Sequence, residues 1–174
     1  MNRNPVLTLV TALALTVAPL TSFAGVNVGD KPRLQFKATD GTAVSLEKYR
    51  GRIVLVDFWA TWCPPCMKLA NEMVALNKEF SPKGMQVIGV SLDQDRAKLD
   101  QVCKEKGFTW PQYFDGKGWD NEIWKTWGEE SVPFTVILSP DGTVIWKGTP
   151  GPGLKEEIEK AFKEHPPRRA DATR

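Results

Sequence analysis

Residues 53–66 read IVLVDFWATWCPPC, an apolar run that is followed closely by two cysteines. The run from Ile53 to Trp59 is rich in β-branched and aromatic residues, a pattern typical of a central strand covered on both faces. After Cys63, apolar residues recur at helical spacing until Ser81-Pro82. The stretch therefore predicts a buried strand that passes through the two cysteines into a helix.

The two cysteines lie where a helix begins. Cys63 is expected at the N-cap and Pro64 at the first helical position, where proline is favoured. Pro64 and Pro65 carry no N–H, so Cys66 supplies the first backbone donor that can point back at the Cys63 sulfur. Only a thiolate attacks a disulfide, and a helix N-terminus contributes about 0.3–2 kcal/mol to its stability. We predict that Cys63 is the nucleophile and that Cys66 resolves the mixed disulfide.

Two structural alternatives exist for this pair. A zinc site needs four ligands, and the chain offers only Cys63, Cys66, Cys103 and His165, so no metal is expected. A purely structural disulfide does not explain why the pair lies at a strand-to-helix junction, where thiols become reactive.

Asp57 is a charged residue inside the predicted buried strand, six positions before Cys63. It is either a satisfied polar residue at a strand end or a carboxyl with a raised pKa that exchanges a proton with Cys66. We favour the second interpretation because perturbed carboxyls cluster at functional sites.

The rest of the chain fits one domain. Its 174 residues carry a net charge of +2, with 41% hydrophobic and 25% charged residues, so nothing indicates nucleic-acid binding. The pattern predicts an α/β fold, a mixed central sheet with helices on both faces and an N-terminal β-hairpin. The remaining predicted elements are a hairpin at 34–46 turning at Asp40-Gly41, a strand at 85–91, helices at 94–106 and 122–127, a hairpin at 134–147, and a last helix around 154–162.

The N-terminal segment is typical of a secretory signal. No charge occurs between Arg3 and Asp30, residues 6–18 are apolar, and Ser22-Phe23-Ala24 is a small-x-small site. We therefore expect a signal peptide at 1–24, a folded domain at 25–165 and a flexible tail at 166–174. An uncleaved membrane anchor is the alternative, although the apolar run is shorter than the roughly 20 residues that span a bilayer.

The chain resembles thioredoxin-fold thiol–disulfide oxidoreductases, and more closely their extracytoplasmic TlpA/ResA-like branch. The resemblance rests on residues 54–66, Gly29-Asp30-Lys31-Pro32, Asp40-Gly41, 46–51, Val132-Pro133-Phe134-Thr135 and Asp141-Gly142. It implies a thioredoxin-like fold in which Pro133 is cis and lies against the disulfide. It also implies a substrate-binding surface made by Trp62, Pro64, Val132 and Pro133, with the Val132 backbone pairing with an extended substrate.

The resemblance further implies an exported reductant, of the kind that keeps apocytochrome c or other exported cysteines reduced. No prosthetic cofactor is expected; electrons would come from a membrane-embedded thiol carrier, and we expect a monomer. The branch often has an acid three positions after its second cysteine and a proline two positions later, where this chain has Leu69 and Asn71. That departure leaves Asp57 as the evident proton carrier.

Other functions remain open from the sequence. A disulfide-donating oxidant would have the same fold, and a metal-delivery domain would want a histidine ligand, whereas His165 lies in the tail. A thiol peroxidase would want threonine where Ala60 stands. A non-enzymatic domain would hold a permanently oxidised pair. Cys103 falls on an apolar stripe with Leu99 and Val102, which favours an inert buried thiol.

Overall fold

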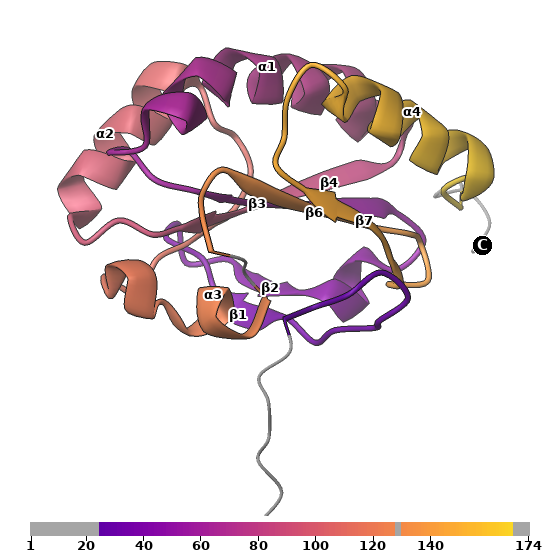
Figure 1. The fold of residues 1–174 in the computed structure, drawn as a ribbon, viewed down its shortest axis with the longest axis horizontal. Coiled ribbons are helices and arrows are strands. Elements are labelled where there is room, and N and C mark those ends of the chain that lie inside the picture. Colours follow the sequence, from indigo (N-terminus) through magenta and orange to yellow (C-terminus); the bar gives the residue numbers. More distant parts are fainter. Residues whose placement is uncertain (1–24, 128–129, 169–174) are drawn as a thin grey trace, which may run out of the picture.

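The computed structural model describes residues 25–127 and 130–168, which form a mixed sheet flanked by helices (Figure 1). The strand order is β5-β4-β3-β6-β7, and a separate two-stranded sheet pairs β1 with β2. The strands are β1 (Gln35–Lys37), β2 (Ala43–Ser45), β3 (Ile53–Trp59), β4 (Met85–Ser91), β5 (Gln112–Tyr113), β6 (Phe134–Leu138) and β7 (Val144–Gly148). Central β3 runs parallel to β4 and antiparallel to β6, so the predicted mixed sheet is confirmed.

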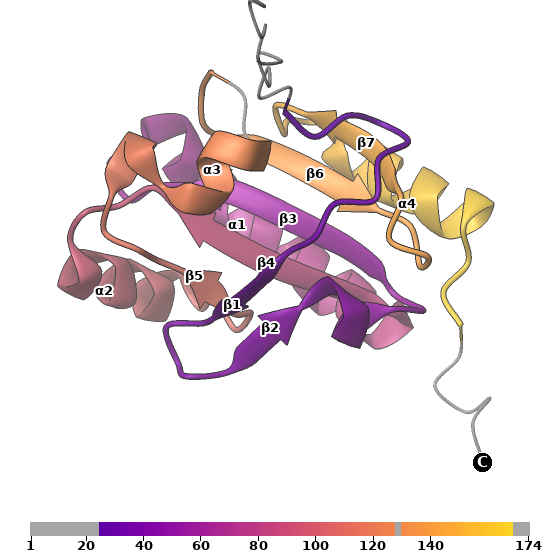
Figure 2. The same ribbon diagram turned by 90° about the horizontal axis from the view of Figure 1, so that it is seen from below.

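Helices cover both faces of this sheet. Figure 1 shows α1 and α4 above it, and α3 with the β1–β2 hairpin below it; Figure 2 shows the hairpin from that lower side. The elements are α1 (Pro64–Phe80), α2 (Arg96–Lys106), α3 (Glu122–Trp127) and α4 (Leu154–Glu164), with short 3-10 helices η1 (Leu46–Tyr49), η2 (Ser81–Lys83) and η3 (Gly118–Asp120).

Strand β3 is buried along its whole length, as its apolar run predicts. Ile53 and Leu55 pack with the side chains of α1 and α4. Val54, Val56 and Phe58 pack on the opposite side, with the hairpin and α3. Because side chains alternate along a strand, Asp57 shares the face of Leu55, towards α1.

The N-terminal hairpin forms, but its turn differs from the prediction. The sequence predicts a two-residue turn at Asp40-Gly41, whereas residues 38–42 connect β1 to β2, closed by an Ala38 N–H to Thr42 C=O bond of 2.8 Å. Thr39 leaves the strand pairing because its N–H donates to Gln112 of β5 and its carbonyl accepts from Arg96. The turn itself stays tight, because the Gly41 N–H donates to the Ala38 carbonyl at 2.9 Å, but it holds three residues, 39–41, rather than two.

Most helix predictions are confirmed with small shifts in their bounds. Helix α2 starts two residues later than predicted, because the Asp95 side chain caps it by accepting from the Lys98 N–H. It ends at Gly107, whose φ of 77° suits a left-handed cap. Helix α3 has the predicted bounds, whereas β5 and η3 lie between residues 107 and 121, where the sequence predicted no element.

The predicted signal peptide at 1–24 and residues 169–174 of the predicted tail lie outside the described residues. Within the tail, the Arg168 N–H donates to the Gly51 carbonyl at 2.9 Å. Among the described residues, no helix has the length and hydropathy needed to cross a bilayer.

Candidate active site

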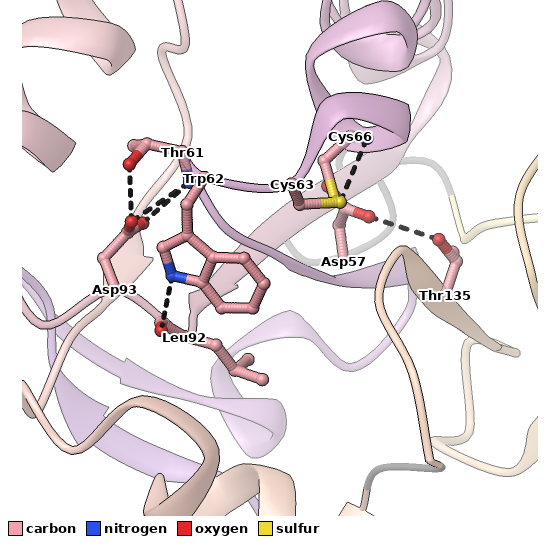
Figure 3. The surroundings of a disulfide bond; sticks show 8 residues. All are labelled: Asp57, Thr61, Trp62, Cys63, Cys66, Leu92, Asp93 and Thr135. Carbon is pink, nitrogen blue, oxygen red and sulfur yellow. Dashed lines mark hydrogen bonds between the residues drawn. A yellow bond between two sulfur atoms is a disulfide. The ribbon is translucent and has the colours of Figure 1, made fainter.

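The two cysteines form a disulfide at the N-terminus of α1 (Figure 3). Cys63 is the N-cap in extended conformation, and Pro64 is the first helical residue, as predicted. The Cys66 N–H donates to the Cys63 sulfur at 3.2 Å. The same donor is placed to stabilise a Cys63 thiolate once the disulfide is reduced, in addition to the positive end of the helix dipole.

Both cysteines are buried, with 3% of Cys63 and 5% of Cys66 exposed. Exposure therefore does not separate a nucleophile from a resolving cysteine in the oxidised form. The backbone hydrogen bond does separate them, because only the Cys63 sulfur receives it among the interactions described.

Asp57 lies beneath the disulfide, on the face of β3 that α1 covers (Figure 3). Its side chain is buried, and its carboxylate accepts a hydrogen bond from the Thr135 hydroxyl of β6 at 3.2 Å. Burial raises the pKa of Asp57 to about 7, and the Thr135 hydroxyl partly offsets that rise. A carboxyl with this pKa can both accept and give a proton near neutral pH.

A small cavity joins Asp57 to Cys66. Its volume is about 10 Å³, the room of a single water molecule, and its other lining residues are Trp59, Leu69, Ala70, Met73, Phe108, Pro133 and Pro150. Leu69, which stands where the resembling branch often has an acid, makes this wall apolar. Among the described residues that line the cavity, Asp57 is thus the only ionisable group besides Cys66.

The Val132–Pro133 peptide bond is cis, as the resemblance implies. Pro133 lines the cavity beside Cys66, immediately before β6 begins. The loop that carries Val132 is thereby held next to the disulfide, where the sequence analysis places a substrate-binding surface.

Asp93 is a site residue that sequence reasoning missed. Its buried carboxylate accepts from the Thr61 N–H at 3.1 Å and from the Thr61 hydroxyl at 2.6 Å (Figure 3), and it also accepts from the Ser91 hydroxyl at 2.7 Å. It thus fastens the turn before Cys63 to the end of β4. The available signal was an acidic residue just after a buried strand.

Trp62, the predicted substrate-facing residue, lies on the surface beside the disulfide. Its side chain is 49% exposed, and its indole N–H donates to the Leu92 carbonyl at 3.3 Å. Neighbouring Trp119 is also 49% exposed, with its ring centroid 5.5 Å from that of Trp62. Sequence reasoning did not separate Trp119 from the other tryptophans of residues 110–127.

Cys103 is a free thiol on α2 and takes no part in the disulfide. It is half-buried rather than fully buried, and burial raises its pKa to about 12, which makes it a poor nucleophile at neutral pH. No group of three or more histidine, cysteine or acidic side chains that could hold a metal ion occurs within residues 25–127 and 130–168.

Comparison with known proteins agrees with this geometry. The model of the AhpC/TSA family matches residues 28–147. The thiol-disulfide oxidoreductase ResA of Bacillus thuringiensis is 28% identical over 138 residues, covering 79% of this chain and 78% of that protein. ResA of Oceanobacillus iheyensis is 33% identical over 122 residues, covering 67% and 62%.

Solved structures of thiol-disulfide oxidoreductases also resemble this chain. The thioredoxin domain of a thiol-disulfide oxidoreductase from Bacteroides vulgatus matches with a TM-score of 0.69 and 26% identity, covering 78% of this chain and 98% of that one. A thiol-disulfide oxidoreductase from Bacteroides fragilis matches with a TM-score of 0.68 and 28% identity, covering 75% and 97%.

Proposed function

The chain belongs to the AhpC/TSA family and is a thiol–disulfide oxidoreductase with a thioredoxin-like fold; from this premise we propose that it is exported and reduces disulfides in other proteins. The observation that carries the proposal is the Cys63–Cys66 pair at the start of α1 with a buried carboxyl against Cys66. A structural disulfide would need neither the N-terminal helix position nor a carboxyl whose pKa is near 7.

In the first step, the Cys63 thiolate of the reduced protein attacks one sulfur of a substrate disulfide. The Cys63–substrate bond forms, the substrate S–S bond breaks, and the released substrate thiolate takes a proton from water. The Cys66 N–H and the helix N-terminus stabilise the attacking thiolate.

In the second step, Cys66 resolves the mixed disulfide. Its thiol gives a proton to the Asp57 carboxylate across the small cavity, and the Cys66 thiolate attacks the Cys63 sulfur. The Cys63–Cys66 disulfide forms, and the second substrate thiolate leaves and is protonated. Two electrons have then passed to the substrate, and the oxidised protein must be reduced by a thiol donor.

The substrate segment lies across the surface made by Trp62, Pro64, Val132 and Pro133 in this proposal. Pro133 is adjacent to Cys66 through the shared cavity, and the backbone of Val132 lies just before β6, which begins at Phe134. An extended substrate can pair with that backbone as an added strand.

Export is proposed from the N-terminal segment, and the electron supply from the family resemblance. A signal peptide at 1–24 would deliver residues 25–174 to an oxidising compartment, the periplasm if the source is a Gram-negative bacterium. A membrane-embedded thiol carrier would then supply the electrons. Exported cysteines, such as those of apocytochrome c, are the proposed targets.

The direction of electron flow is tested by the reduction potential of the Cys63–Cys66 pair, measured against glutathione and dithiothreitol by tryptophan fluorescence. A value near −270 mV, about that of thioredoxin, supports a reductant. A value near −120 mV, about that of a strong disulfide donor, would show an oxidant and overturn the proposal.

The attacking residue is tested separately, with Cys66→Ser and Cys63→Ser. The Cys66→Ser protein should accumulate a mixed disulfide through Cys63, visible by mass spectrometry, because the resolving sulfur is missing. The Cys63→Ser protein is the matched control. A stable adduct on Cys66 instead would reverse the two roles.

A further inference from the structure

Two exposed tryptophans meet beside the active-site disulfide. Apart from Val28, Trp62 and Trp119 are the only large hydrophobic side chains that are exposed within the described residues. Their ring centroids lie 5.5 Å apart, so they form one apolar surface rather than two scattered residues. Exposed apolar surfaces of this kind mark binding sites.

A rigid support holds Trp119 in place. Its ring packs on buried Trp124 at 5.7 Å, and Trp124 packs on Phe58 of β3 at 5.5 Å. Asn121 fixes the same segment: its side-chain oxygen accepts from the Trp124 N–H, and its amide donates to the Ser91 carbonyl at the end of β4. The surface is therefore preorganised, and a ligand would not have to order it on binding.

A groove of about 440 Å³ lies at these tryptophans, with Leu92, Gln94 and Gly118 among its lining residues. We call it the tryptophan groove. Its two charged lining residues have partners on the same segment: Lys117 pairs with Glu122 and Asp120 with Lys125. The groove thus combines two aromatic rings with polar groups whose charges are paired within the segment, which suits an uncharged apolar side chain better than an ionic ligand.

We propose that the tryptophan groove binds an aromatic or large aliphatic side chain of the substrate protein, a few residues from the cysteine that Cys63 attacks. The inference rests on the proposed function and adds a substrate class to it. The attacked sulfur must come within bonding distance of Cys63, and Trp62 precedes Cys63 in the chain, so a substrate residue one or two positions from that sulfur can reach the groove at about 3.3 Å per residue of extended chain. The occupant is therefore a protein segment that exposes an apolar residue near its cysteine.

The test compares two quenched fluorogenic peptide disulfides that differ only two residues from the cysteine, with phenylalanine in one and serine in the other. Oxidised glutathione, which is small and anionic, is the third probe. For the wild-type protein we expect kcat/KM to be about tenfold higher for the phenylalanine peptide, because one apolar side chain in a pocket is worth a factor of this order.

The phenylalanine-to-serine ratio is then measured in variants. Trp119→Ala should reduce the ratio to about 1–2. Gln94→Trp, which fills the groove from an exposed position just before the N-cap of α2 and removes no core contact, should do the same even if Trp119→Ala folds poorly by circular dichroism. Val28→Ala is the matched control, because Val28 lies on a different surface, next to Trp146 and His165; its ratio should stay near that of the wild type.

If the wild-type protein reduces the two peptides at equal rates, the proposed binding in the tryptophan groove is wrong. It is also wrong if a tenfold ratio persists in Gln94→Trp. Faster turnover of oxidised glutathione than of both peptides would identify a small anionic substrate instead. Failure to reduce any of the three probes would overturn the proposed function itself, which separates that failure from failure of the groove alone.

Discussion

Asp57 is the one charged side chain in β3, and its position under Cys66 determines what happens when it is replaced. Asp57→Asn keeps the shape but cannot accept the Cys66 proton. We expect resolution of the mixed disulfide to slow about 100-fold at pH 7, the lower end of the range for general acid–base catalysis. The wild-type pH–rate profile should show an inflection near pH 7 that the variant lacks. An unchanged profile would contradict a proton-transfer role.

Thr135→Val provides the matched variant for this carboxyl. The Thr135 hydroxyl donates to Asp57 and lowers its pKa, so its removal should move the inflection to higher pH. The inflection should shift without disappearing, in contrast with Asp57→Asn. Stopped-flow kinetics between pH 5 and pH 9 distinguish the two results.

The same carboxyl makes stability depend on pH. The pKa of Asp57 is about 7 in the folded protein, against an ordinary value of 3.8 in an unfolded chain. The unfolded chain therefore binds fewer protons between these pH values, and stability falls as pH rises. From pH 5.5 to 8 the oxidised protein should lose about 2 kcal/mol that Asp57→Asn does not lose. Urea unfolding at both pH values measures the difference, and parallel losses in the two proteins would refute it.

At this residue scale, the sequence pointed to Asp57 because a charge inside an apolar run is conspicuous. Trp119 gave no such signal. Its place beside the active site follows from its ring contacts with Trp62, which is distant in sequence, and with Trp124 of the neighbouring helix. The near-complete burial of Cys63 was likewise missed, since burial of an N-cap residue depends on the whole surrounding fold.

At the scale of elements, the turn between β3 and α1 depends on the end of β4. Asp93 holds that turn through the N–H and the hydroxyl of Thr61. Asp93→Asn exchanges a charged acceptor for an amide that cannot receive all these bonds, and it should cost about 1–3 kcal/mol of unfolding free energy. Differential scanning calorimetry at neutral pH measures the loss.

Asp95→Asn is the matched control, two residues along the chain. Asp95 is exposed and caps α2, and asparagine caps a helix about as well as aspartate. We expect a change within about 0.5 kcal/mol. Equal losses for Asp93→Asn and Asp95→Asn would show that Asp93 does not hold the turn.

Elements with a strong local pattern were predictable and elements made by tertiary contacts were not. Strand β3 and helix α1 follow directly from an apolar run, two prolines and a helical period. Strand β5 has only two residues, which pair with Gly89 and Val90 of β4, and no local sequence pattern predicts it. The hairpin turn was predicted one residue too short: Thr39 belongs to the turn, and its N–H donates to Gln112, a contact far along the chain that the local sequence does not indicate.

At the scale of the whole molecule, the order β5-β4-β3-β6-β7 places β3 in the centre of the sheet. This central strand carries Asp57 and leads directly into the active-site turn. The mixed sheet was predictable from the order of elements. The meeting of β6, the cis Pro133 and α1 at one cavity came into the prediction only through the family resemblance.

The last prediction concerns export. When the full chain is produced in a Gram-negative bacterium, mass spectrometry of the protein from the periplasm should show an N-terminus at Gly25, because Ser22 and Ala24 form the small-x-small site. Ala24→Arg should block this cleavage, since the peptidase pocket takes only small residues. Phe23→Ala changes the position between them and should be cleaved as the wild type is. Recovery of the uncleaved wild-type chain from the membrane would favour an anchor. Recovery from the cytoplasm would contradict export, and with it the oxidising compartment and the membrane electron donor. The Cys63–Cys66 chemistry does not depend on this outcome.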